Sequence, residues 1–124
     1  MRHITKAACT LMLVLLLAAC GKQHQAEVLA EEFMEANLSN PGAMSRLEFK
    51  DLDSTRVVSD SLVGVMRQRL EQGGRYKSGI TYAEGAPTKP LMITRATYLL
   101  NGEECQDTYY LDVELTRVVA VKQN

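Results

Sequence analysis

The stretch that decides the fold is LMITRATYLLNGEECQDTYYL, residues 91–111. Its first ten residues are rich in β-branched and aromatic side chains, which favour strands. Asn101 and Gly102 follow, and because both residue types tolerate positive φ, the pair predicts a two-residue hairpin turn. Residues 104–111 then predict the return strand. The stretch therefore indicates an antiparallel hairpin.

Alternating segments on either side of this hairpin predict further strands. Residues 116–122 place apolar side chains on two faces, after a turn around residues 112–114. Residues 76–83 predict another strand, and the Gly- and Pro-containing residues 84–90 predict a loop. Residues 46–50 alternate polar and apolar side chains, which is typical of a half-buried strand.

Two segments with apolar residues at three- and four-residue steps predict helices. The first covers residues 25–38, and Pro41 with Gly42 ends it because proline cannot continue a helix. The second begins after Ser59 as N-cap and ends at Gly73 and Gly74. We expect its apolar stripe to be buried; the stripe consists of Val58, Leu62, Val65, Met66 and Leu70.

Together these elements predict an α+β fold. Two helices pack on one face of a curved antiparallel sheet of about four to five strands, because a helix must bury its apolar stripe against another layer. The order of elements over residues 25–122 resembles the cystatin-like and nuclear-transport-factor-2-like α+β folds. That resemblance implies a sheet wrapped around a helix, and in the transport-factor-like proteins often a pocket between sheet and helix.

The N-terminal segment points to export. It starts with the basic MRHITK, followed by an apolar run over residues 7–19, which is the layout of a secretory signal peptide. A helix of about 13 residues spans roughly 20 Å, less than the hydrocarbon core of about 30 Å. At its end, Leu17-Ala18-Ala19-Cys20 resembles the lipobox of bacterial lipoproteins.

The lipobox resemblance implies that the peptide bond before Cys20 is cut and that the Cys20 thiol carries lipid. Several acyl chains would then hold the protein on the membrane. Gly21 stands where an aspartate often retains such proteins in the inner membrane, which favours the outer membrane. We expect a signal peptide over residues 1–19, a lipidated N-terminus and tether over residues 20–25, and one small α+β domain over residues 26–124.

The net charge of the mature chain limits the classes of partner that it can bind. Removing residues 1–19 from the 124-residue chain leaves 105 residues, with 12 basic and 15 acidic side chains and a net charge of −3. This charge gives no support to nucleic-acid binding, which needs a basic footprint. We expect the membrane, reached through lipid on Cys20, and an envelope protein as partners; the oligomeric state stays open.

Cysteine and histidine usage limits the chemistry. After loss of Cys9 and lipidation of Cys20, Cys105 is alone, and we expect it to be buried rather than in an intermolecular bridge. Residues 26–124 contain no histidine, which excludes Ser-His-Asp and Cys-His catalysis and the usual zinc sites. Asp51 and Asp53 lack the rest of a calcium-binding loop, so we expect a turn there. We predict no catalytic, metal or cofactor-binding residue.

Three functions remain open. The first is a lipid-anchored protein with a non-catalytic binding or adaptor domain. The second, implied by the transport-factor-like resemblance, is a ligand-binding or enzymatic pocket in which Asp107 and Tyr109 supply a base and an electrophile. The third is a peptidase inhibitor of cystatin type, although the loops at residues 85–90 and 101–102 lack that family's Gln-Val-x-Val-Gly-like sequence. We expect Asp107 to be solvated, and a basic cluster to be solvated as well: Arg67, Arg69, Arg75 and Lys77.

Lipidation of Cys20 can be tested directly. We expect cells that express the full chain to incorporate labelled palmitate into it, and the Cys20→Ala variant to remain an unlabelled precursor, because the thiol that accepts lipid is gone. Continued labelling of Cys20→Ala would show that the lipobox interpretation is wrong. Cys9→Ala, a change within the signal peptide, is the matched control and should label normally.

Overall fold

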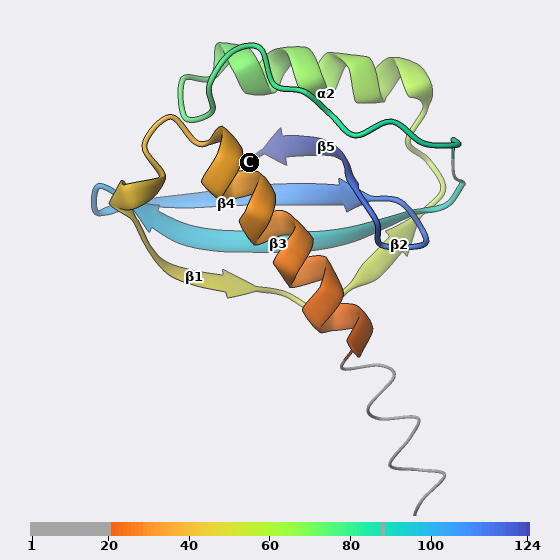
Figure 1. Ribbon diagram of the computed structural model, residues 1–124, viewed down its shortest axis with the longest axis horizontal. Helices are drawn as coiled ribbons and strands as arrows, with labels where there is room; N and C mark the ends of the chain where they lie inside the picture. Colours follow the sequence, from red (N-terminus) through yellow and green to blue (C-terminus); the bar gives the residue numbers. More distant parts are fainter. Residues whose placement is uncertain (1–20, 88) are drawn as a thin grey trace, which may run out of the picture.

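The computed structural model describes residues 21–87 and 89–124; the predicted signal peptide and Cys20 lie outside these residues. It confirms the predicted α+β fold, with two helices and an open, five-stranded antiparallel sheet (Figure 1). The first helix covers residues 21–37. The other elements are a short 3₁₀ turn and six named segments: η1 Pro41–Ala43, β1 Met44–Phe49, β2 Asp53–Thr55, α2 Asp60–Gln72, β3 Leu91–Leu100, β4 Glu103–Leu111 and β5 Val118–Gln123.

The central hairpin forms as predicted. Leu100 pairs with Glu103, and Asn101 and Gly102 connect them with φ values of 53° and 81°. These positive values are what a tight hairpin between twisted strands requires. β3 is long enough to pair with β4 on one side and with β1 and then β2 on the other, so the order across the sheet is β1-β3-β4-β5 with β2 beyond the end of β1.

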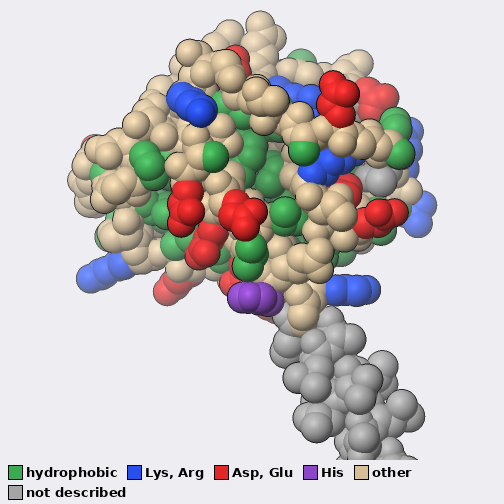
Figure 2. Space-filling model, in the orientation of Figure 1, with side chains coloured by type: hydrophobic (Ala, Val, Ile, Leu, Met, Phe, Trp, Pro, Cys, Tyr) green, Lys and Arg blue, Asp and Glu red, His purple; other side chains and the backbone are tan. Residues whose placement is uncertain are grey.

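The first helix lies across the concave side of the sheet (Figure 1). Its inner side carries Ala26, Ala30 and Met34, which are all fully buried. The small alanines allow the helix backbone to approach the sheet closely. The outer side is acidic, and Figure 2 shows red carboxylate side chains over this face of the molecule.

The N-terminal end of this helix is fastened to the domain. Residues 21–25, for which the sequence predicts a tether, are helical. The Gln23 side chain donates to the Lys50 carbonyl at 3.2 Å and accepts from the Leu52 amide at 2.6 Å. Gln25 Nε2 donates to the Leu115 carbonyl at 2.7 Å. These partners lie far away in sequence, which is why composition alone suggested a free polar segment.

Helix α2 runs alongside the edge strand β5 (Figure 1). Ser59 caps it as predicted, because its hydroxyl accepts from the Leu62 amide at 3.2 Å. Arg67 Nε donates to the Val119 carbonyl at 2.8 Å, and the Gln123 side chain donates to the Leu70 carbonyl at 3.2 Å. The helix thus covers the polar edge of β5, which would otherwise be free to pair with another chain.

Two strand predictions differ from the structure. Residues 76–83 are not a strand: Tyr76 forms a single bridge with Leu38 at the end of the first helix, and the chain then continues irregularly. The prediction is wrong because α2 already occupies the β5 edge where a further strand would pair. Conversely, Asp53 and Ser54 are predicted to lie in a turn, but together with Thr55 they form the short strand β2, Asp53–Thr55.

The buried face of α2 is narrower than the sequence predicts. Met66 and Leu70 are buried, whereas Leu62 and Val65 are 42% and 39% exposed. The expectation that Leu62 is a core residue is therefore wrong. A helix at the edge of a sheet touches the core along one line of side chains, so the rest of its apolar stripe faces solvent. Among the described residues, no helix has both the length and the hydropathy that crossing a bilayer demands.

This geometry predicts unequal effects of two similar truncations in α2. Leu70→Ala should lower the free energy of unfolding by about 2–5 kcal/mol, because it opens a cavity in the core. Leu62→Ala should change it by only about 0.5 kcal/mol, as at an exposed position. Urea denaturation of both variants measures the difference. Equal losses would mean that Leu62 is packed after all.

Candidate functional site

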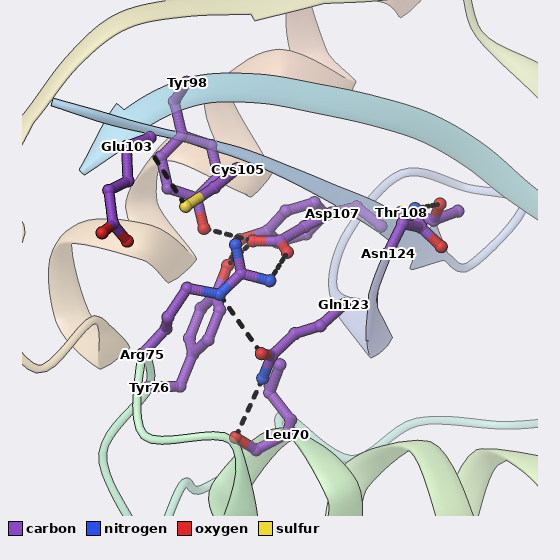
Figure 3. A network of polar contacts seen from close by, with 11 residues as sticks. Leu70, Arg75, Tyr76, Tyr98, Glu103, Cys105, Asp107, Thr108, Gln123 and Asn124 are labelled. Carbon is purple, nitrogen blue, oxygen red and sulfur yellow. Dashed lines mark hydrogen bonds and ion pairs between the residues drawn. The ribbon is translucent and has the colours of Figure 1, made fainter.

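Asp107, the base that the transport-factor-like alternative would use, lies at the centre of a buried polar network (Figure 3). Asp107 is on β4 opposite Ala96, and its side chain points toward the helices with 0% exposure. Its Oδ1 accepts a hydrogen bond from Arg75 Nη2 at 2.8 Å. Its Oδ2 accepts from the hydroxyls of Tyr76 at 2.6 Å and Tyr98 at 2.5 Å.

The hydroxyl groups form a directed chain. The Tyr76 and Tyr109 hydroxyls are 2.6 Å apart. Because Tyr76 uses its proton toward Asp107, Tyr109 must donate its own to the Tyr76 oxygen. Tyr109 therefore reaches the carboxylate only through Tyr76. The predicted pair, Asp107 and Tyr109, shares a strand face as expected, but the two side chains are separated by a residue from another segment.

Segments far apart in sequence bring these groups together. Gly74, with φ of +83°, turns the chain after α2 so that Arg75 lies over β4. Arg75 Nε also donates to the Gln123 side chain at 3.2 Å, which links the network to β5 and, through Gln123, to the α2 terminus. Backbone hydrogen bonds of the two neighbours of Tyr76 hold it in place. The Arg75 carbonyl accepts from the Ser39 amide, and the Lys77 amide donates to the Asn37 carbonyl, both at 2.8 Å.

Phe33 of the first helix covers the side of the network that faces this helix. Its ring centroid lies 5.9 Å from that of Tyr109, edge to face, and 6.2 Å from that of Tyr76. Aromatic packing of this kind excludes water and adds stabilisation of about 0.5–1.5 kcal/mol per pair. The carboxylate is consequently sealed from solvent by aromatic rings and by the Arg75 guanidinium.

The surroundings control the charge of each group. Burial raises the pKa of Tyr76, Tyr98 and Tyr109 well above the usual range, and the nearby Asp107 carboxylate raises the pKa of each further. Burial lowers the pKa of Arg75 and the Asp107 carboxylate raises it, with a net upward shift. The three tyrosines therefore stay neutral and act as hydroxyl donors beside the Arg75–Asp107 ion pair.

This arrangement is suited to holding the structure together and not to acid–base chemistry. Both oxygens of Asp107 are occupied by donors, and solvent does not reach them. A general base needs a free lone pair within reach of its substrate. The expectation that Asp107 is solvated is wrong. Its inward position beside Tyr109 and Leu111 in the strand pattern could have indicated a buried acid, which requires partners.

The predicted basic cluster is divided by the fold. Arg75 donates to Asp107 in the buried network. The Arg67 guanidinium lies 4.1 Å from the centroid of the Tyr82 ring, and its Nε donates to the Val119 carbonyl of β5. Arg69 and Lys77 are exposed. The expectation of a solvated cluster is therefore wrong for Arg67 and Arg75, because both guanidinium groups satisfy acceptors inside the domain.

The remaining predicted positions are also placed. Cys105 is a free, buried thiol, as predicted. Asp51 is exposed, and Asp53 accepts a hydrogen bond from the Ser54 amide at 2.8 Å within β2. Among residues 21–87 and 89–124, no group of three or more His, Cys, Asp or Glu side chains is arranged to hold a metal ion.

An accessible groove lies between α2 and the β4–β5 strands. It has a volume of about 270 Å³ and exposes more apolar than polar surface. Sequence reasoning missed it because it assigned Leu62 to the core. The apolar floor of the groove consists of Leu62, Met66, Leu70, Tyr110 and Val121. Its basic rim consists of Arg69 and Lys122.

No protein-family model, curated protein or solved structure matches this chain. The assignment of function consequently depends on the geometry of the buried network and of the groove.

The buried network predicts that Asp107→Asn is strongly destabilising. The change removes the counter-charge of Arg75 and turns an amide N–H₂ toward hydroxyl donors, so we expect a loss of about 3–5 kcal/mol in the free energy of unfolding. Tyr98→Phe, which removes one bond to the carboxylate, should cost about 1.5–3 kcal/mol. The exposed Asp53→Asn is the matched control and should be nearly neutral. An Asp107→Asn variant as stable as that control would contradict a sealed carboxylate.

The raised tyrosine pKa values predict that the folded protein loses stability at alkaline pH. In the unfolded chain a tyrosine loses its proton near pH 10, whereas in the folded protein Tyr76, Tyr98 and Tyr109 keep theirs. The folded state then binds more protons, so stability is complete below about pH 10 and falls above it by about 1.4 kcal/mol per pH unit for each such tyrosine. Absorbance at 295 nm should show these tyrosines ionising together with unfolding. Gradual ionisation of all tyrosines near pH 10 in folded protein would contradict this.

Proposed function

We propose that this chain is a lipid-anchored protein of the bacterial cell envelope whose small domain binds a partner without catalysis. The proposal that the domain is not catalytic rests on the Asp107 carboxylate, whose two oxygens both accept hydrogen bonds and are out of reach of solvent. The proposal that the protein is lipid-anchored rests on the Leu17-Ala18-Ala19-Cys20 pattern. Gly21 favours the outer membrane.

The groove beside α2 is the surface that best supports binding. Leu62 and Val65 are exposed along one side of α2, although apolar residues on a helix are normally turned toward a core. Arg69 and Lys122 flank the groove. An apolar segment of an envelope protein, with acidic side chains next to it, would match both the floor and the rim. The groove is small, which suits one or two anchor side chains and not a large interface.

The pocket expected from the transport-factor-like resemblance has less support. The space between the first helix and the sheet is where Phe33, Tyr76 and Tyr109 pack against one another. A ligand in that space would have to displace these rings and break the bonds to Asp107. For the cystatin-type inhibitor, the loops still offer no matching sequence. Binding at the outer groove requires neither rearrangement nor a special loop.

Site-specific crosslinking in cells tests this proposal. A photo-crosslinking amino acid replaces Leu62 in the groove, and in a matched control it replaces Val57, which is 87% exposed but does not line the groove. We expect one dominant envelope protein to be captured from position 62 and not from position 57. Reversal of the rim charge with Arg69→Glu and Lys122→Glu should reduce that capture several-fold.

The outcomes separate the possibilities. Capture from both positions at similar yield, or from neither, would overturn the groove as a docking site. Capture that is unaffected by the charge reversals would overturn the acidic character of the partner. Normal membrane fractionation of each variant shows that loss of capture does not arise from loss of the anchor.

A further inference from the structure

The helix over residues 21–37 leaves no room for a flexible spacer after Cys20. The described helix already includes Gly21, the residue directly after the lipidation cysteine. Two residues later, Gln23 bonds to both sides of the β1–β2 connection, at the Lys50 carbonyl and the Leu52 amide. Gln25 bonds to the β4–β5 connection at the Leu115 carbonyl. The anchor end of the helix is thus fixed to two loops of the domain.

From this geometry we propose that the lipid anchor holds the domain directly on the bilayer in one orientation. The inference rests on the proposed lipidation of Cys20. The surface that meets the lipid headgroups is the anchor-side surface, defined as the described start of the first helix with residues 50–52 and 112–115. The partner of this surface is the bilayer itself.

Distances decide between this arrangement and a loose tether. A helix rises about 1.5 Å per residue, so Gln25 lies only about 6 Å along the axis from Gly21, the residue bonded to Cys20. The loops bonded to Gln23 and Gln25 are therefore within about one Debye length of the lipid headgroups. A flexible linker of about 25 residues would instead place the domain roughly 25–30 Å away on average and leave it free to rotate.

The orientation points the groove away from the membrane. In Figure 1 the described start of the first helix is at the bottom of the molecule, beyond the β1 edge of the sheet, and α2 is at the top, beside the β5 edge. An apolar groove beside α2 would then face the envelope space, where a protein partner can reach it. The fixed anchor and the exposed groove together present one surface to lipid and another to protein.

Charge attraction is not what holds the anchor-side surface to lipid. Exposed residues on it include Lys22 and Lys50 as well as Asp51 and Glu114. Figure 2 shows basic and acidic side chains along the edge of the domain where the described chain begins. Opposite charges in similar number give little net attraction to an anionic surface. The orientation should consequently persist at high salt and on neutral lipid.

Fluorescence quenching by headgroup-labelled lipid tests the inference. The lipidated protein, expressed with its own leader and purified from membranes, is reconstituted into phosphatidylcholine vesicles that contain spin-labelled choline headgroups. A fluorophore is attached at Asp51→Cys, on the exposed residue between the two groups that Gln23 binds, or at Gln68→Cys, exposed on α2. Cys105 is buried, and wild-type protein measures any background labelling.

We expect quenching at position 51 to exceed quenching at position 68 several-fold, at low and at high salt. A ten-residue Gly/Ser insertion between Cys20 and Gly21 should abolish the difference. Equal quenching at both positions in protein whose mass includes the acyl chains would overturn the inference and leave the anchor intact. A mass without acyl chains would instead overturn the proposed lipidation itself.

Discussion

The rest of the structure depends on one buried charge, the carboxylate of Asp107. A carboxylate without water is costly unless it is paired and hydrogen-bonded, and removing it from water costs several kcal/mol. Three donors from two segments meet that requirement: Arg75 and Tyr76 after α2, and Tyr98 on β3. Since two of the three donors come from the segment after α2, the requirement is met only when that segment is docked on the sheet.

The same requirement explains how α2 reaches its position without a broad apolar face. Arg75 bonds to Gln123, and Gln123 bonds to the last turn of α2 at the Leu70 carbonyl. Arg67 adds a bond to the β5 backbone. Polar contacts thus set the helix along the β5 edge, with Met66 and Leu70 supplying the burial. Leu62 and Val65 are left exposed, and Leu62 joins Met66 and Leu70 in lining the groove that we propose as the docking site.

The proposals assign separate tasks to the ends of one small domain. The first helix connects the proposed lipidation site, Cys20, to the sheet and is fastened by Gln23 and Gln25. The centre is a rigid core with a sealed polar network. The α2 side carries the accessible groove. A domain of this kind can hold a partner at a set distance and orientation from the membrane, which a domain on a long tether cannot do.

The sequence by itself determined the local elements and the proposed destination of the protein. The β3–β4 hairpin follows from its alternation and from Asn101-Gly102, and α2 follows from Ser59 and the apolar stripe, because these signals act over a few residues. The lipobox is equally local. Only the tertiary structure decided that Asp107 is buried, that residues 76–83 form a single bridge at Tyr76 and no strand, that Leu62 is exposed and that residues 21–25 are docked. Each of these depends on partners 27 to 90 residues away or on which edge of the sheet is already covered, and no short-range pattern records that information.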